Sequence, residues 1–248
     1  MISERKLSRG FESVWKSLFP MLTPTFMRTF NEDFLKSIAS SCTNNISTRK
    51  FVTESPEVVS EFGIQLAKNS VHTEISSEDI GKDRDSLTNA WNEAQTLVSR
   101  YEGMPTNAVE TPLLESYKNQ GIYLAKNLIA FTESIDGTID FSPCIPGANA
   151  ISQCEADLSI GETLVEIKTV SRTFRSRDLK QLLVYLALDW IRGAKWKKGC
   201  LLNPRLAKWA DFEVDPLIKI LSGRSASDTF RDFIDTIGSN LEMEFTDF

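Results

Sequence analysis

Apolar residues recur at intervals of three or four through much of the first hundred positions, which is the spacing of one face of an α-helix. The pattern predicts helices at about residues 11–19, 26–35, 56–68 and 83–101. Ser55-Pro56-Glu57 is a typical helix start, because proline fits the first helical turn. The first part of the chain, residues 1–103, is therefore expected to be a helical region.

The pattern changes after residues 104–112, which are typical of a linker or loop. The elements predicted beyond this linker are, in chain order, a helix at 113–133, strands at 138–144, 150–160 and 164–170, a helix at 177–192, short strands at 199–203 and 211–214, and two final helices, the second capped at Ser225 or Ser227. Strands that alternate with helices indicate a layered α/β domain, here at residues 110–248.

Composition agrees with a folded globular protein, since 41% of the 248 residues are hydrophobic and 25% are charged. No apolar run approaches the ~18 residues of a membrane-spanning helix. The N-terminal residues mix both charge signs, which is not typical of a signal peptide. The four cysteines are scattered, which favours reduced thiols in a cytoplasmic protein over a disulfide framework or a zinc site.

Charge is unevenly distributed along the chain. The net charge is −6, but residues 168–208 hold eleven basic and two acidic side chains, a balance of +9, which leaves −15 for the rest. A local excess of positive charge suits a surface that faces a polyanion. A solvated basic face explains the same count equally well.

Charged residues also interrupt the most strand-like part of the chain. Glu166 and Lys168 lie two positions apart within Leu164–Val170, so they project from one face of the predicted strand. Asp157, on the preceding strand of a meander, would place its carboxylate beside Glu166. Two such carboxylates suit a hard cation such as Mg²⁺, with the Ile167 carbonyl as a further ligand. The alternative is an ion pair between Glu166 and Lys168 on an exposed strand.

Asp157 followed by Glu166-Ile167-Lys168 resembles the D…(D/E)-x-K core of the PD-(D/E)XK nuclease superfamily. Gln181 and Tyr185, one turn apart on the next predicted helix, resemble the Q-x-x-x-Y motif of its RecB-type members. The resemblance covers about residues 110–215 and implies a restriction-endonuclease-like core of a helix, three strands, a helix and a strand. It also implies cleavage of DNA with Mg²⁺ or Mn²⁺, with Asp157 and Glu166 as metal ligands and Lys168 as the catalytic lysine.

Members of the superfamily often add a glutamate from the first core helix. Glu115 is the first choice for this role, and it is assigned to the catalytic and metal-binding set, with Glu110 and Glu133 as rivals. A glutamate that only interacts with the helix dipole is an equally good explanation of Glu115. Iron–sulfur variants need a C-terminal cysteine cluster, and only Cys200 follows Gln181, so no iron–sulfur cluster is expected.

Basic residues follow the predicted catalytic strand directly. Arg172, Arg175 and Arg177 surround Phe174 in a short loop, an arrangement that suits phosphate contacts with one aromatic ring free to stack on a base. Lys180 and Arg205 are expected to extend this nucleic-acid-binding surface. A basic loop without a partner is the competing interpretation.

The leading hypothesis is a metal-dependent deoxyribonuclease with, by analogy, a role in bacterial or phage restriction, repair or defence. Its helical N-terminal region, rich in Phe and Trp, is then expected to contact a helicase, an ATPase or a second copy of the chain. One alternative is a catalytically inactive nuclease-like module that binds nucleic acid or a partner protein. Another is an unrelated helical interaction protein that matches both motifs by chance.

Overall fold

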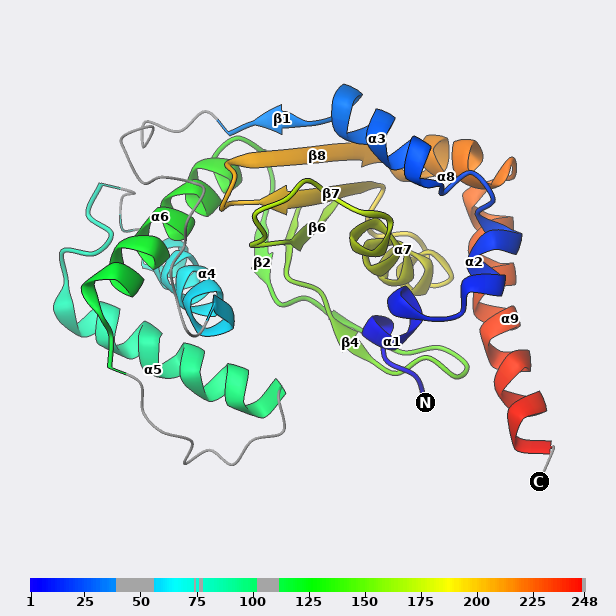
Figure 1. Ribbon diagram of the computed structural model, residues 1–248, viewed down its shortest axis with the longest axis horizontal. Helices are drawn as coiled ribbons and strands as arrows, with labels where there is room; N and C mark the ends of the chain where they lie inside the picture. Colours follow the sequence, from blue (N-terminus) through cyan, green and yellow to red (C-terminus); the bar gives the residue numbers. More distant parts are fainter. Residues whose placement is uncertain (39–55, 74, 76–77, 102–111, 247–248) are drawn as a thin grey trace.

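The computed structural model describes residues 1–38, 56–73, 75, 78–101 and 112–246 (Figure 1). The helices are α1 (Glu4–Arg9), α2 (Glu12–Leu18), α3 (Pro24–Asp33), α4 (Pro56–His72), α5 (Arg84–Tyr101), α6 (Glu115–Thr132), α7 (Ser176–Trp190), α8 (Val214–Ser222) and α9 (Ala226–Thr246). Within these ranges, no helix is both long and apolar enough to cross a lipid bilayer.

The strands are β1 (Lys36–Ser37), β2 (Ile139–Phe141), β3 (Cys144–Ile145), β4 (Cys154–Glu155), β5 (Leu158–Ile160), β6 (Thr163–Ile167), β7 (Lys198–Asn203) and β8 (Lys208–Glu213). Six of them form one mixed sheet in the order β1-β8-β7-β6-β5-β2, and β3 pairs with β4 in a separate two-stranded sheet. Among the strand pairs of this sheet that the structure describes, β6–β7 is the parallel one, and α7 connects these two strands. The protein is therefore a mixed α/β fold, and the six-stranded sheet excludes a purely helical protein.

The large sheet separates two hydrophobic clusters. One cluster packs α7 and the helices α1, α2, α3, α8 and α9 against one face, and the other packs α4, α5 and α6 against the opposite face (Figure 1). Strand β6 contributes to both clusters, because Leu164 faces the first and Val165 and Ile167 face the second. By the same alternation, Glu166 lies on the face that α7 covers.

The element order predicted after residue 113 is confirmed as far as its helices and the strands β5, β6, β7 and β8. The single strand predicted at 138–144 is wrong, because Ser142, with a left-handed φ of 59°, and Pro143 divide it into β2 and β3. Most of 150–160 is likewise irregular, with only β4 and β5 in strands. The predicted cap of the last helix is confirmed at Ser225, whose Oγ accepts a hydrogen bond from Asp228 N.

The helical N-terminal region is packed into the rest of the chain rather than displayed to solvent. Strand β1 extends the sheet beside β8, α1 packs against α7, and α4 packs against α6. Its aromatic residues Trp15, Phe19 and Phe30 are buried. These rings therefore do not form the exposed docking surface expected from the sequence. The proposed boundary between residues 103 and 110 lies outside the described residues.

Candidate active site

The β5–β6 hairpin brings the two carboxylates predicted from the sequence together. Leu158 pairs with Val165 across the hairpin, so the next antiparallel positions are Asp157 and Glu166, on the same face. Asp157 Oδ2 accepts a hydrogen bond from Ile167 N at 2.6 Å. Strand β6 is buried along its whole length, and Glu166 is only 1% exposed. This burial rules out the exposed-strand ion pair that the sequence left open.

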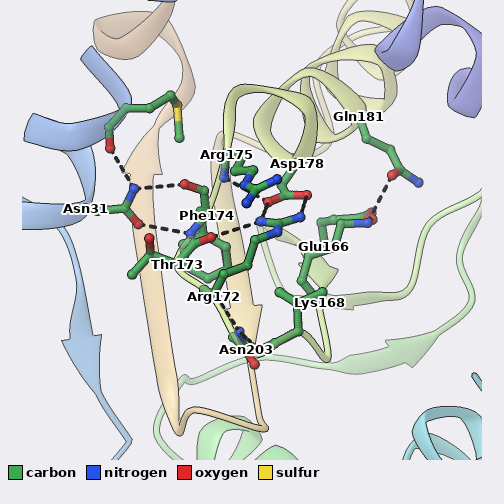
Figure 2. A network of polar contacts seen from close by, with 12 residues as sticks. Asn31, Glu166, Lys168, Arg172, Thr173, Phe174, Arg175, Asp178, Gln181 and Asn203 are labelled. Atoms are coloured by element: carbon green, nitrogen blue, oxygen red, sulfur yellow. Dashed lines mark hydrogen bonds and ion pairs between the residues drawn. The ribbon is translucent and has the colours of Figure 1, made fainter. Parts of the chain in front are cut away.

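Lys168 lies directly after β6, and its side chain forms hydrogen bonds both to that strand and to α7. Its Nζ donates to Glu166 Oε1 and, at 3.0 Å, to Gln181 Oε1 (Figure 2). The Gln181 side chain then donates through Nε2 to the Tyr185 hydroxyl at 3.1 Å. The two motifs noted in the sequence therefore form one continuous hydrogen-bonded chain from β6 to α7.

The start of α7 is held by an ion pair between half-buried Arg172 and buried Asp178. Arg172 forms a forked contact with Asp178, with nitrogen–oxygen distances of 2.6 and 3.1 Å, and Arg175 N donates to the same carboxylate at 2.8 Å (Figure 2). Burial alone would raise the pKa of Asp178, but these donors outweigh it and hold that pKa below its ordinary value. The pair fixes the first turn of α7, and so the position of Gln181 one turn later.

A cavity of about 710 Å³ opens at the end of β6. Its lining includes Asp157, Glu166, Lys168, Gln181 and Tyr185, which the sequence had assigned to the site. The remaining wall residues come mainly from α1, α4 and the segment from Gln153 to Ala156. The cavity therefore lies at the end of an inner strand of the sheet, and helices from both sides of the sheet contribute to its walls.

Helix α4 brings a further carboxylate, Glu61, to this cavity, and sequence reasoning missed it. Glu61 lines the cavity and accepts a hydrogen bond from Gln65 Nε2 at 2.7 Å. The available signal was the spacing of Glu61, Gln65 and Lys68, which puts three polar side chains on one face of α4. Glu155 and Glu4 also line the cavity.

The structure does not bring Glu115 to the cavity with the other predicted site residues. Its side chain is 74% exposed at the first turn of α6, it contacts Lys118 at 3.7 Å, and it does not line the cavity. Glu115 is the first residue of α6, where the helix dipole stabilises a negative side chain. Of the two rivals, Glu133 is exposed beyond the end of α6 and Glu110 lies outside the described residues.

Burial dominates the electrostatics of the cavity. It raises the pKa of Glu166 to about 8, and the neighbouring Asp157 adds to this effect against the Lys168 ammonium. Burial also raises the pKa of Asp157 and of Glu61. Burial alone would lower the pKa of Lys168, but Glu166 and Asp157 outweigh it, so that pKa is raised and the ammonium stays charged.

The donor set fits a hard divalent cation with few protein ligands. Glu166 Oε2 is buried without a hydrogen-bond partner in the protein, beside the Asp157 carboxylate. A buried carboxylate oxygen without a donor is costly, and a bound cation would satisfy it. No group of three His, Cys, Asp or Glu residues in the described ranges is arranged to hold an ion. Mg²⁺ is compatible with this, because it often takes only one or two carboxylates with water and phosphate.

The basic loop differs from its prediction in three places. Arg172 is bound to Asp178 rather than available to a ligand. Lys180 is buried, with its Nζ 3.0 Å from Glu12 and over the Trp15 ring. Phe174 is 3% exposed and packs in the core, so it cannot stack on a base. Helix α2 covers Lys180, Asp178 binds Arg172, and the core encloses Phe174, none of which charge counting reveals.

Three of the predicted basic contacts remain accessible to different degrees. Arg175 and Arg177 are exposed at the start of α7, and neither lines the cavity. Arg205 is half-buried in the turn between β7 and β8, where burial lowers its pKa. Their role in binding nucleic acid stays a prediction.

No protein-family profile matches this chain, and a search of curated proteins finds no significant relative.

Proposed function

We propose that this protein is a metal-dependent nuclease that hydrolyses phosphodiester bonds in DNA. The observation that carries the proposal is the single cavity in which Asp157, Glu166 and Lys168 meet Gln181 and Tyr185. The D…ExK residues lie on the β5–β6 hairpin and the Q-x-x-x-Y residues lie on α7, so the cavity brings two separate motifs of one nuclease superfamily together. The proposal is also supported by the order of helix α6, the antiparallel strands β2, β5 and β6, helix α7 and strand β7, which is the order that the resemblance implies once the small β3–β4 sheet between β2 and β5 is set aside.

Asp157 and Glu166 would hold the cation, Mg²⁺ or Mn²⁺, with Glu61 on the part of the cavity wall that α4 forms. The cation supplies charge stabilisation of the phosphate and a more acidic water. The Ile167 carbonyl stays a predicted further ligand. Glu166, with its pKa near 8, would be ionised more readily beside a cation, which couples binding to release of a proton.

Lys168 acts in this proposal as a hydrogen-bond donor and fixed positive charge. Its raised pKa keeps it protonated, so it is better suited to orient the attacking water or to stabilise charge on the phosphate than to remove a proton. Gln181 directs the ammonium, and Tyr185 holds Gln181. The water oxygen forms the new bond to phosphorus as the bond to the leaving oxygen breaks, and the leaving oxygen takes up a proton.

One observation favours a second candidate, a nuclease-like module that binds nucleic acid or a protein without cutting. The Lys168 ammonium already contacts Glu166 Oε1, which takes one oxygen of the proposed ligand pair. A protein that had lost its cation could keep the fold through this internal ion pair.

The wider context also belongs to the proposal. A restriction, repair or defence role rests on analogy with the nuclease superfamily. A cytoplasmic location is supported by the free thiols of Cys144, Cys154 and Cys200. A helicase, an ATPase or a second copy of the chain stays the proposed partner. The aromatic residues of the N-terminal region do not support this part of the proposal, because they are buried.

Cleavage assays test the proposal. Wild type would be incubated with single-stranded, linear duplex and circular DNA in Mg²⁺, Mn²⁺ or EDTA, beside Lys168→Ala. Lys197→Ala is a matched control, because Lys197 forms an exposed ion pair with Glu162 at 3.0 Å outside the cavity. We expect metal-dependent cleavage by wild type and Lys197→Ala, and a loss of at least 100-fold in Lys168→Ala. Equal cleavage by Lys168→Ala, or none by wild type, overturns the catalytic assignment. Retention of DNA without cutting favours the binding module.

A further inference from the structure

The walls of the cavity come from opposite faces of the sheet, and each carries one basic residue. Helix α1, which packs against α7, contributes Arg5, and helix α4, which packs against α5 and α6, contributes Lys68. The carboxylates Asp157 and Glu166 lie at the end of the sheet that separates these two helical layers. A ligand that crosses the cavity from α1 to α4 therefore passes the carboxylates on its way between two positive charges.

Lys68 belongs to the α4 face that forms the wall of the cavity. It lies on the same helical face as Glu61 and Gln65, at spacings of seven and three residues, and all three line the cavity. Lys68 is half-buried, and its charge opposes the rise in the pKa of Glu61. Its ammonium is therefore close enough to the candidate ligands to act on a phosphate that they face.

Arg5 lies on a helix that is held firmly in place. Ile2 exchanges backbone hydrogen bonds with Ala150 and Ser152, at 2.8 and 2.9 Å, and Trp15 Nε1 donates to Leu7 O at 2.9 Å. The Arg5 guanidinium acts electrostatically on Asp157 and contacts Glu4 at 3.6 Å, with 55% of its side chain exposed. An exposed ion pair of this kind contributes little to stability.

Three further cations near the site take part in contacts within the protein. Lys168 contacts Glu166 and Gln181, Arg172 contacts Asp178, and Lys180 contacts Glu12. Acidic side chains outnumber basic ones in the cavity lining. The acidic residues are Glu4, Glu61, Glu155, Asp157 and Glu166, and the basic residues are Arg5, Lys68 and Lys168. A polyanion can approach so acidic a cavity only where positive charge flanks the carboxylates.

We propose that Arg5 and Lys68 bind the phosphates next to the reactive one, so that the substrate backbone runs across the cavity from α1 to α4. The identity of the ligand as nucleic acid rests on the proposed function. The N-terminal helix α1 is thereby part of the substrate-binding site rather than an attachment to it. Arg5 can contact phosphate with two nitrogens, whereas Lys68 contributes a single charged group.

Binding measured without cleavage tests this proposal. The probe is a fluorescein-labelled phosphorothioate oligonucleotide, used as single strand and as duplex, with the full chain in Ca²⁺ and in EDTA. Anisotropy titrations at several salt concentrations compare wild type with Arg5→Gln and Lys68→Gln. Arg9→Gln, on the same helix, and Lys16→Gln, on α2, are matched controls, because both side chains are exposed and outside this cavity. Thermal unfolding checks that all variants are folded.

We expect Arg5→Gln and Lys68→Gln each to weaken binding roughly tenfold at low salt. Each should also reduce the slope of log affinity against log salt by about 0.7 for a single strand or 0.9 for a duplex. The proposal is overturned if both variants bind like Arg9→Gln and Lys16→Gln, or if wild type does not bind the probe. Binding that depends on both residues, without cleavage in any metal, leaves this inference standing and removes only the nuclease assignment.

Discussion

Replacing Glu166 with glutamine should make the metal-free protein relatively more stable as the pH rises. Glutamine keeps the shape of the side chain but cannot ionise in the cavity. The wild-type carboxyl, by contrast, is 1% exposed and must ionise beside Asp157. The perturbation therefore isolates the cost of a buried negative charge, which the proposed cation would otherwise offset.

The magnitude follows from the pKa of Glu166, which is about 8 in the folded protein and ordinarily 4.5. A carboxyl with a raised folded pKa contributes its full stabilisation below pH 4.5, and this contribution is lost as the pH rises through 8. The difference between the two values corresponds to a ceiling of roughly 5 kcal/mol. Water reaches the cavity beside Lys168, which is 19% exposed, so we expect a loss of about 3 kcal/mol between pH 5 and pH 9.

Urea unfolding in EDTA at pH 5, 7 and 9 measures this effect. The free energy of unfolding of Glu166→Gln, minus that of wild type, should increase by about 3 kcal/mol from pH 5 to pH 9. Glu162→Gln, on the same hairpin but 61% exposed, serves as the control and should follow wild type. If the Glu166→Gln and wild-type curves stay parallel from pH 5 to pH 9, Glu166 titrates normally and the reasoning about its burial fails.

Three further predictions test how the site is built. Glu61→Gln should reduce DNA cleavage by roughly 10- to 100-fold, measured as initial rate, whereas Glu115→Gln should leave it unchanged; the reverse order would return the third carboxylate to α6. Arg172→Met should lower the free energy of unfolding at pH 7 by about 3 kcal/mol, because it leaves Asp178 buried without its partner, and this loss should shrink as the pH falls below about 4. A change under 1 kcal/mol would contradict a stabilising role for the Arg172–Asp178 ion pair. Gly121→Ala should destabilise the protein by about 1 to 3 kcal/mol in urea, because its Cβ would lie 2.2 Å from Phe62 on α4; a neutral effect would mean that α4 and α6 pack differently.

Local patterns in the sequence were sufficient for the parts of the site that depend on neighbouring residues. Strand alternation predicted that Glu166 and Lys168 share one face of the strand. Helical spacing predicted that Gln181 and Tyr185 share one face of the helix. The structure joins the two pairs through the hydrogen bond between Lys168 and Gln181. Hairpin pairing, a short-range feature, brought Asp157 opposite Glu166. These relations follow from periods of 2 and 3.6 residues and need no tertiary information.

Long-range packing explains what the sequence did not reveal. Glu61 reaches the cavity because α4 packs on α6 beside the sheet, and no local pattern fixes which helix takes that place. Lys180 looked like part of a basic surface until α2 was found to cover it. The left-handed Ser142 similarly ended a strand that residue preferences would have continued. In each case the deciding contact joins residues that are distant in the chain or depends on a single backbone angle.

Binding of Mn²⁺ tests the central claim, a divalent-cation site at Asp157 and Glu166, most directly. Electron paramagnetic resonance would follow the loss of the free Mn²⁺ signal as protein is added at pH 8, for wild type, Asp157→Asn, Glu166→Gln and Glu115→Gln. We expect binding of at least one Mn²⁺ per chain by wild type and Glu115→Gln, with affinity reduced at least tenfold in Asp157→Asn and Glu166→Gln. Equal binding by all four proteins, or no binding by wild type, would contradict the account.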